Sequence, residues 1–308
     1  MSSRILPEFE LFFPQSISEA VGLLSEYGEK MVVMAGGTDL LVHLKSFRER
    51  LASTAGHIDP AHPVSHYHPQ YILSLSEVPG LNHIEFSEKD GLRIGAMASL
   101  ADVTESEEVK TRYPAIWQSA KENGTVQTRN RATLVGNLLR ASPGGDCCCS
   151  VLANGGSLVL QGHGGKREVE IDGFWTGYRE TSRRADELAV ELRIPSPSKD
   201  TVSSFVRLTR TKLDISKINA AVSLTMDGKH CRKARIAMGC VAPTPLRLMK
   251  AEALMADKPL TEDLFGSLAE TVAKEIKPID DVRSSAEYRR EVAGVLIRRA
   301  IETACGTI

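Results

Sequence analysis

An apolar run that stops at two glycines most constrains how this chain can fold. Residues 31–35 have the length and composition of a short buried strand, and Gly36 and Gly37 end it. Thr38 or Asp39 can then cap a helix, because apolar residues follow at helical spacing. The unpaired backbone N–H groups of such a turn bind phosphate oxygens. Since the turn matches neither the G-x-G-x-x-G nor the P-loop pattern, an ordinary strand–helix turn remains an alternative.

A second glycine-containing loop is expected over residues 127–146, where many side chains can form hydrogen bonds. Thr133, Asn137 and Ser142 can donate to phosphate, and Asp146 can accept from a ribose hydroxyl. Alone, this segment could equally be a structural loop. Two such segments far apart in the sequence suit a long dinucleotide whose pyrophosphate is gripped from two sides.

Composition is that of an ordinary globular chain long enough for two domains. The 308 residues are 42% hydrophobic and 25% charged, with a formal net charge of −1, which gives no electrostatic case for binding nucleic acid or membrane. No apolar run approaches the roughly 20 residues of a membrane span. The N-terminus carries prolines and acidic residues where a signal peptide needs an apolar stretch, so a cytoplasmic location is expected.

A Pro/Ser stretch over residues 195–198 is the best candidate for a domain boundary. Strand patterns follow it, at residues 203–208, 220–226 and 234–240. Two helices are expected at the end of the chain, over residues 261–275 and 286–305. The arginines of the last helix, among them Arg289, are expected on a solvated face.

Three motifs together carry a resemblance to a known family. AGGTDLL at residues 35–41, QTRNRATLVGN at 127–137 and SPGGD at 142–146 resemble the FAD-binding subunits of the xanthine dehydrogenase and carbon monoxide dehydrogenase family of molybdenum hydroxylases. The likeness runs through most of the chain, including FELFFPQSISEAVGLL at the start and IGAMASLADV further on. Found together, these motifs are far more specific than any one of them alone.

The resemblance implies an α+β fold with two domains. A two-lobed FAD-binding domain (PCMH/VAO-like) is expected over residues 1–197, with an N-terminal lobe at about 1–55 and a larger lobe at about 70–197. A small α+β C-terminal domain is expected over residues 198–308, with a three-stranded sheet packed on helices.

The resemblance also implies the residues that hold FAD. In that family, the segments that correspond to residues 35–41 and 127–146 bind the pyrophosphate and adenosine parts of FAD. Carried over, this role falls on Ala35, Gly36, Gly37, Thr38, Asp39, Leu40, Thr133, Gly136, Asn137, Ser142 and Asp146. The segment around Lys212 is similar to a basic segment that approaches the flavin ring, where a lysine would stabilise negative charge on the reduced ring. A surface lysine at a strand end is the alternative.

Two features depart from the family pattern. Val135 replaces the first of two glycines, and its side chain would narrow the approach to the cofactor. Cys147, Cys148 and Cys149 replace an apolar, proline-containing segment. Adjacent cysteines do not all reach one metal without unusual backbone geometry, so small buried side chains are favoured over a metal site.

A histidine-containing insertion also invites a metal interpretation. Residues 55–70 hold four histidines, at positions His57, His62, His66 and His68, which could ligate zinc or iron only in an ordered loop. An exposed or subunit-facing loop is favoured. The 4-hydroxybenzoyl-CoA reductase branch carries an extra iron–sulfur cluster on several cysteines of an insertion. Residues 55–70 contain no cysteine, so we predict no cluster and no metal in this chain.

The resemblance implies an electron-transfer subunit that binds FAD non-covalently and has no catalytic residue of its own. Molybdopterin and 2Fe–2S clusters are then expected only on partners, an iron–sulfur small subunit and a molybdenum-binding large subunit, in a dimer of heterotrimers. Electrons would pass between those clusters and an external acceptor or donor. The main alternative is a self-contained FAD-dependent oxidase or dehydrogenase acting on its own substrate. A domain that has lost its nucleotide is a third hypothesis.

Overall fold

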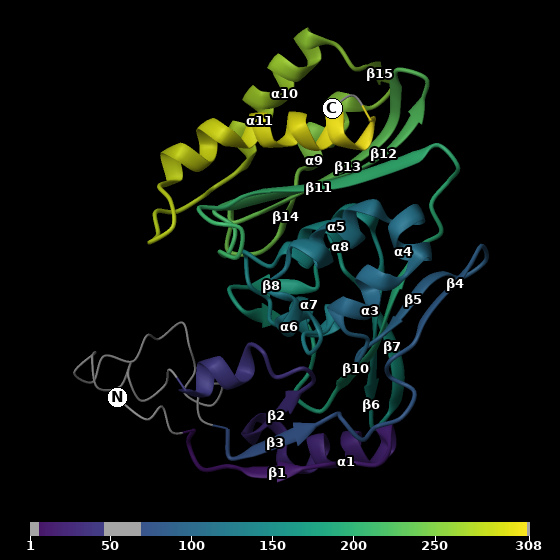
Figure 1. Ribbon diagram of the computed structural model, residues 1–308, viewed down its shortest axis with the longest axis vertical. Helices are drawn as coiled ribbons and strands as arrows, with labels where there is room; N and C mark the ends of the chain where they lie inside the picture. Colours follow the sequence, from purple (N-terminus) through teal and green to yellow (C-terminus); the bar gives the residue numbers. More distant parts are fainter. Residues whose placement is uncertain (1–5, 46–68, 307–308) are drawn as a thin grey trace.

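Three main β-sheets, each built from a different stretch of the chain, organise the structure (Figure 1). The computed structural model describes residues 6–45 and 69–306. The N-terminal lobe lies at the bottom of Figure 1, the larger lobe in the middle and the C-terminal region at the top. The expected histidine-containing loop, His57 to His68, lies outside the described residues.

The N-terminal lobe is a parallel three-stranded sheet, in the order β1-β3-β2, with a helix against it. Its elements are β1 (Glu10–Phe12), α1 (Ile17–Tyr27), the short 3-10 helix η1 (Gly28–Lys30), β2 (Met31–Met34) and β3 (Tyr71–Ser74). Ser16 caps α1 by accepting from the Glu19 N–H at 3.1 Å, and Gly28 ends it at φ 52°. The buried face of α1 packs against Val159 and Val190, which joins this lobe to the next sheet.

The larger lobe is an antiparallel five-stranded sheet in the order β4-β5-β10-β6-β7. Its strands are β4 (Ile84–Ser87), β5 (Gly91–Gly95), β6 (Ser157–Gly162), β7 (Gly165–Glu170) and β10 (Leu188–Ile194), with a separate two-stranded hairpin of β8 (Trp175–Gly177) and β9 (Glu180–Thr181). Its helices are α3 (Leu100–Glu105), α4 (Glu107–Arg112), α5 (Pro114–Glu122), α6 (Val126–Arg129), α7 (Leu134–Leu139) and α8 (Asp146–Asn154). One face of the sheet and these helices enclose the main apolar core.

The segment expected as a glycine-containing loop is largely helical, and that expectation was wrong. Residues 127–146 contain the end of α6, all of α7 and the start of α8. Thr125 and Thr133 cap α6 and α7, and Leu134, Val135 and Leu138 give α7 a buried face at helical spacing. Local capping and burial outweigh the glycine content of this stretch.

The C-terminal region contains the three long strands that the sequence predicted. They are β11 (Thr201–Leu208), β12 (Ile218–Asp227) and β13 (His230–Gly239), and two-residue strands β14 (Leu246–Arg247) and β15 (Lys258–Pro259) extend the sheet. Its helices are α9 (Met249–Met255), α10 (Glu262–Glu275) and α11 (Ala286–Ala304). Side chains alternate along β12, so that Ala221 joins the main core of the larger lobe while Ala220 and Val222 pack in a second core with the helices.

Arg289 of α11 is not on a solvated face, so that expectation was wrong. Its residue is 1% exposed, and its guanidinium donates to the carbonyls of Lys217 and Ile279 and to the Asp281 carboxylate. Helical periodicity cannot predict this, because the acceptors come from two other segments. No helix within residues 6–45 and 69–306 is both long and apolar enough to span a membrane.

Candidate functional site

The two segments singled out in the sequence line one cleft between the N-terminal lobe and the larger lobe. Its volume is about 690 Å³, within the range of small-molecule and cofactor sites. Nine of the proposed cofactor residues line it: Ala35, Gly36, Gly37, Thr38, Asp39, Leu40, Thr133, Gly136 and Asn137. Ser142, Asp146 and Lys212 are not among the lining residues.

The first turn presents unpaired backbone donors to this cleft. β2 ends at Met34, and residues 40–45 are helical. Within the described residues, no hydrogen bond uses the N–H groups of Gly36, Gly37 or Thr38. Unpaired donors at the start of a helix favour a bound anion.

Close packing ties the first turn to the second segment. A Cβ added to Gly36 would lie 1.7 Å from the carbonyl oxygen of Arg131, so the backbones meet where a side chain has no room. Asp39 and Arg140 form an ion pair across the same junction, with 3.3 Å between Oδ1 and Nε. The contact between Gly36 and Arg131 therefore fixes the positions of the two cleft walls relative to each other, and this contact requires glycine.

In the second segment, residues 127–146, hydrogen bonding and burial fix the start of α7, which forms the other wall of the cleft. The hydroxyl of buried Thr133 accepts from the Gly136 N–H at 3.0 Å and so caps α7. Val135 is 1% exposed and packs in the main core. Val135 also lines the cleft, so the narrowing expected from replacing glycine with valine stays a prediction.

Asp146 lies in a buried network that joins the larger lobe to the C-terminal sheet. One carboxylate oxygen accepts from Ser216 at 2.6 Å and from Asn219 at 2.7 Å, and the other from Arg207 at 3.0 Å. Burial raises the pKa of Asp146 in spite of these donors. The structure gives this carboxylate three partners inside the protein, whereas its predicted acceptance from a ribose hydroxyl stays a prediction.

Ser142 and Lys212 lie on neighbouring loops near this network. The Ser142 hydroxyl accepts from the Gly144 N–H at 3.3 Å in the turn before α8. Lys212 is exposed on the loop between β11 and β12. A Cβ added to Gly144 would lie 3.3 Å from Ile215 Cγ2, so the two loops are in contact.

Several residues of the cleft, three of them arginines, were missed in the sequence. Tyr178 and Arg179, at the tip of the β8–β9 hairpin, and Arg183 beyond it line the cleft, as does Arg140. Arg179 adopts φ 61°, and its N–H donates to the Ala141 carbonyl at 3.1 Å, so the tip is fixed. The hairpin strands are two and three residues long, too short for a periodic signal. These arginines favour an anionic ligand.

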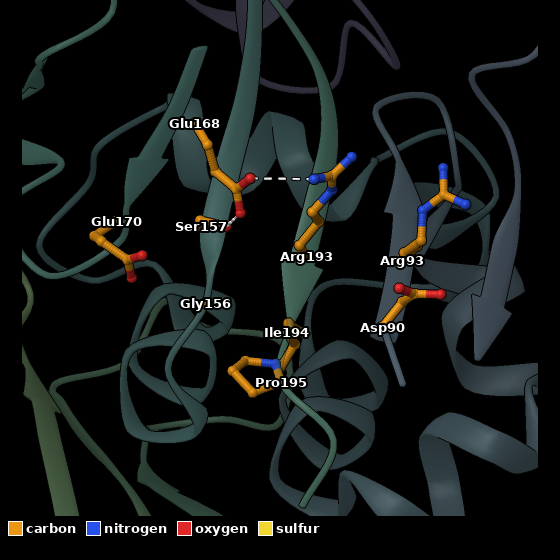
Figure 2. A pocket seen from close by; sticks show the side chains of 9 residues that line it. All are labelled: Asp90, Arg93, Gly156, Ser157, Glu168, Glu170, Arg193, Ile194 and Pro195. Atoms are coloured by element: carbon orange, nitrogen blue, oxygen red, sulfur yellow. Dashed lines mark hydrogen bonds and ion pairs between the residues drawn. The ribbon is translucent and has the colours of Figure 1, made fainter. Parts of the chain in front are cut away.

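A second hollow, of about 560 Å³, lies on the polar face of the five-stranded sheet (Figure 2). Figure 2 shows Arg193 directed at Glu168, with Arg93 on a neighbouring strand. The buried Glu191 carboxylate accepts from Arg93 Nη2 at 2.6 Å, from Arg193 Nε at 2.7 Å and lies 2.9 Å from His83 Nε2. Opposite charges here are paired with one another, which indicates a structural network.

We expect Glu191→Gln to lower the free energy of unfolding by about 2–3 kcal/mol at pH 7, because two guanidinium groups lose a charged acceptor. Burial raises the pKa of Glu191, but its hydrogen bonds to Arg93, Arg193 and His83 outweigh burial and lower it to about 2. The contribution of the carboxylate is therefore complete above the unfolded value near 4.5 and is lost as the pH falls toward 2. Urea unfolding at pH 7 and pH 3 checks this. An equal effect of the substitution at both pH values would contradict it.

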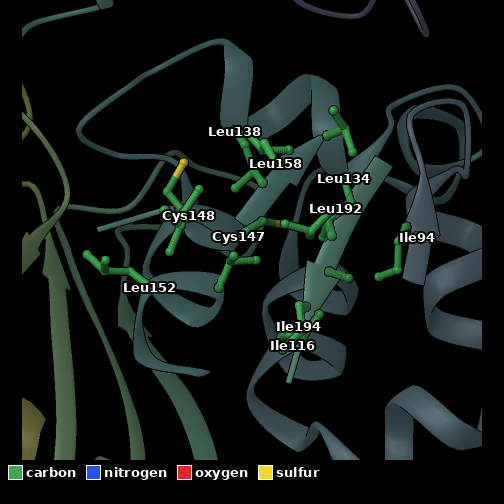
Figure 3. Close-up of a cluster of buried hydrophobic side chains, with 14 of the residues drawn as sticks. Ile94, Ile116, Leu134, Leu138, Cys147, Cys148, Leu152, Leu158, Leu192 and Ile194 are labelled. Atoms are coloured by element: carbon green, nitrogen blue, oxygen red, sulfur yellow. The ribbon is translucent and has the colours of Figure 1, made fainter. Parts of the chain in front are cut away.

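The three adjacent cysteines lie on α8 inside the main core. Figure 3 shows Cys147 and Cys148 among Leu138, Leu158 and other apolar side chains. All three are free thiols with no exposed surface. Burial raises the pKa of Cys147 to about 12 and the pKa values of Cys148 and Cys149 well above the ordinary range. They fill space in the core as neutral thiols.

Thiol labelling of the native chain is expected to modify one cysteine rapidly, Cys305, because the other five are buried. All six are expected to react after unfolding in denaturant. Mass spectrometry of the labelled chain gives both counts. Labelling of Cys147, Cys148 or Cys149 in the native chain as fast as Cys305 would show that α8 is not packed as described.

Comparisons with known proteins agree with this fold. Residues 60–197 match the family model of the FAD binding domain in molybdopterin dehydrogenase, and residues 203–304 match the CO dehydrogenase flavoprotein C-terminal domain. The chain is 30% identical to the carbon monoxide dehydrogenase medium chain of Hydrogenophaga pseudoflava, over 97% of this chain and 98% of that one. It is 27% identical to the xanthine dehydrogenase FAD-binding subunit of Escherichia coli O157:H7, over 94% and 93%.

The same likeness holds in three dimensions. A solved structure of carbon monoxide dehydrogenase from Hydrogenophaga pseudoflava superimposes with a TM-score of 0.88 at 30% identity, covering 98% of this chain and 99% of that one. Fold, cleft and matches define an FAD-binding oxidoreductase subunit. The chain belongs to the flavoprotein (medium) subunits of the molybdenum hydroxylase family that includes carbon monoxide and xanthine dehydrogenases.

Proposed function

We propose that FAD lies extended and non-covalently in the cleft between the two lobes, with its diphosphate at the first turn. The observation that carries this is that two segments far apart in sequence line one cleft, where the N–H groups of Gly36, Gly37 and Thr38 lack partners among the described residues. Ala35, Asp39 and Leu40 complete that wall, and Thr133, Gly136 and Asn137 form the other. Ser142, in the turn before α8, would donate to a phosphate oxygen, and Asp146, the first residue of α8, would accept from a ribose hydroxyl.

The chain binds and tunes the cofactor and provides no nucleophile or acid–base group. FAD exchanges single electrons with iron–sulfur clusters and electron pairs with a hydride acceptor, so it suits a junction between them. We infer that the flavin ring extends toward the β11–β12 loop, where the exposed Lys212 ammonium would stabilise negative charge on the reduced ring. Arg140, Arg179 and Arg183 add positive charge for the diphosphate.

The function that follows is electron transfer within a larger complex. The similar proteins are named as medium chains or FAD-binding subunits, which supports partner chains here as well. We infer an iron–sulfur small subunit and a molybdenum-binding large subunit that hold the 2Fe–2S clusters and molybdopterin, assembled as a dimer of heterotrimers in the cytoplasm. Electrons would pass between those clusters and an external acceptor or donor.

We also infer a division into an FAD-binding domain, residues 1–197, and a C-terminal domain, residues 198–308. Within the first, the lobes would span about 1–55 and about 70–197. The family models support this boundary because one ends at residue 197 and the other begins at residue 203.

Absorbance spectra of the chain, purified alone and then with its co-expressed neighbours, test this function. We expect flavin bands from the chain alone, released into solution by acid precipitation, and additional iron–sulfur absorbance from the complex. Rapid substrate oxidation by the isolated chain would instead support the self-contained oxidase. A folded chain that retains no flavin in either preparation would contradict both.

A further inference from the structure

Arg207, near the end of β11, connects two helices of the larger lobe with the loop that carries Lys212. Its side chain is 7% exposed. The guanidinium donates to the carboxylates of Asp146 at 3.0 Å and Glu122 at 3.2 Å, which belong to α8 and α5 of the larger lobe. It also donates to the backbone carbonyls of Lys212 at 2.6 Å and Asp214 at 3.3 Å, on the β11–β12 loop.

The arch of that loop, residues 211–215, has little else to hold it in place. Leu213 and Ile215 are 60% and 62% exposed, so apolar burial contributes little. The base of the loop is closed by the Lys217 N–H donating to Leu208 O at 2.8 Å and by Ser216 bonding Asp146. Among the residues that the structure describes, Arg207 is the group outside residues 209–217 that hydrogen-bonds to the carbonyls of the arch.

The position of the arch matters because it carries Lys212. Within the described part of the chain, the Lys212 ammonium has neither an ion pair nor a hydrogen bond, so the position of its backbone sets the region that the ammonium can reach. Glu122, the second carboxylate on Arg207, immediately precedes Asn123, which lines the cleft. Arg207 therefore links the neighbour of a cleft residue to the backbone of the residue proposed to face the flavin.

We propose that Arg207 is a positioning residue that fixes the β11–β12 loop, and with it the Lys212 charge, relative to the flavin site. This inference rests on the proposed binding of FAD in the cleft. A planar guanidinium with five donors can serve two carboxylates and two carbonyls at once, whereas a lysine has three donors on one atom and cannot span them. Arg207 itself does not touch the cofactor; it acts through the loop.

Arg207→Lys is the informative variant, because it keeps a positive charge beside Asp146 but loses the planar guanidinium with its five donors. Arg235→Lys is the matched control. Arg235 also joins the C-terminal sheet to the larger lobe, donating to Leu152 O at 2.9 Å and to Asp172 at 2.7 Å, but it contacts no residue of the arch. A loss of general domain docking would appear in both variants, whereas a loss of loop positioning would appear only in the first.

Hydrogen exchange of the full-length chain gives a readout that needs no flavin. The Asp214 N–H donates to Thr211 O at 3.1 Å, and the Thr211 N–H donates to the Asp214 carboxylate at 3.3 Å, so both amides report the order of the arch. We expect exchange over residues 211–214 to become at least tenfold faster in Arg207→Lys and to stay unchanged in Arg235→Lys. Unchanged exchange in Arg207→Lys overturns the proposal, whether or not FAD binds.

The flavin midpoint potential of the FAD-loaded chain tests the link to Lys212. We expect Lys212→Met to weaken stabilisation of the reduced flavin about tenfold, which lowers a two-electron potential by about 30 mV. In the Arg207→Lys background the same substitution is expected to have less than half that effect, because the charge is already displaced. A full effect in that background overturns the proposal. If the wild-type chain binds no FAD, the proposed function fails. If Lys212→Met leaves the potential unchanged, the role of Lys212 at the flavin fails, and with it the proposed link from Arg207 to the flavin. In both cases hydrogen exchange still decides whether Arg207 fixes the loop.

Discussion

Gly36→Ala is expected to weaken FAD binding by about 10- to 100-fold. The new Cβ would lie 1.7 Å from the Arg131 carbonyl oxygen, which belongs to the backbone and cannot move aside as the end of a flexible side chain can. The two walls of the cleft must then separate, at a cost of about 1–3 kcal/mol for an overpacked contact. Because 1.4 kcal/mol is a factor of ten in affinity, this cost weakens the binding of the diphosphate by the N–H donors of the first turn by about 10- to 100-fold.

Titration of the flavin-free variant with FAD, followed by fluorescence or calorimetry, measures this effect. Gly22→Ala is the control, because Gly22 is an exposed position of α1 with nothing within 4 Å of an added Cβ. This control is expected to bind FAD normally and to gain about 0.5–1 kcal/mol of stability, since alanine favours a helix over glycine. Wild-type affinity in Gly36→Ala would mean that the diphosphate does not depend on this turn.

Asp146→Ala is expected to produce the largest loss of stability, about 3–5 kcal/mol. Removing the carboxylate leaves the buried Arg207 with one carboxylate partner, Glu122, and leaves Ser216 and Asn219 without their acceptor. Breaking a buried ion pair and its hydrogen bonds is far more costly than losing a surface contact. Urea unfolding in the absence of FAD measures this, because bound cofactor would add its own stabilisation to the folded state.

The matched control for that experiment is Asp227→Ala. Asp227 also pairs with an arginine, Arg232, but both side chains are more than half exposed. Such surface pairs contribute at most about 1 kcal/mol, so the control is expected to unfold close to the wild type. If Asp146→Ala and Asp227→Ala lower the free energy of unfolding equally, the buried network does not join the two domains as described.

Local signals in the sequence predicted most elements that form on their own. The strand before Gly36 occurs where expected, because it depends on residues within a few positions of it. The long strands of the C-terminal sheet follow from alternation in the same way. The first turn of the cleft, Gly36 to Leu40, was therefore accessible from sequence alone.

What the sequence did not reveal depends on contacts between distant segments. Helix α8 was missed because three cysteines and an aspartate obscure its apolar character until the surrounding core is known. The roles of Arg207 and Arg289 were missed because backbone carbonyls from other segments accept from them. The hairpin tip at Tyr178 and Arg179 gave no signal, since only the fold places it in the cleft.

The central claim is that one flavin dinucleotide has its diphosphate held between two turns that are distant in sequence. An experimental structure of the FAD-loaded chain tests it most directly. We predict diphosphate oxygens within about 3.2 Å of the backbone nitrogens of Gly36, Gly37 or Thr38, with Gly136 and Asn137 on the opposite side. A flavin whose diphosphate lies outside this cleft, away from both turns, would contradict the account.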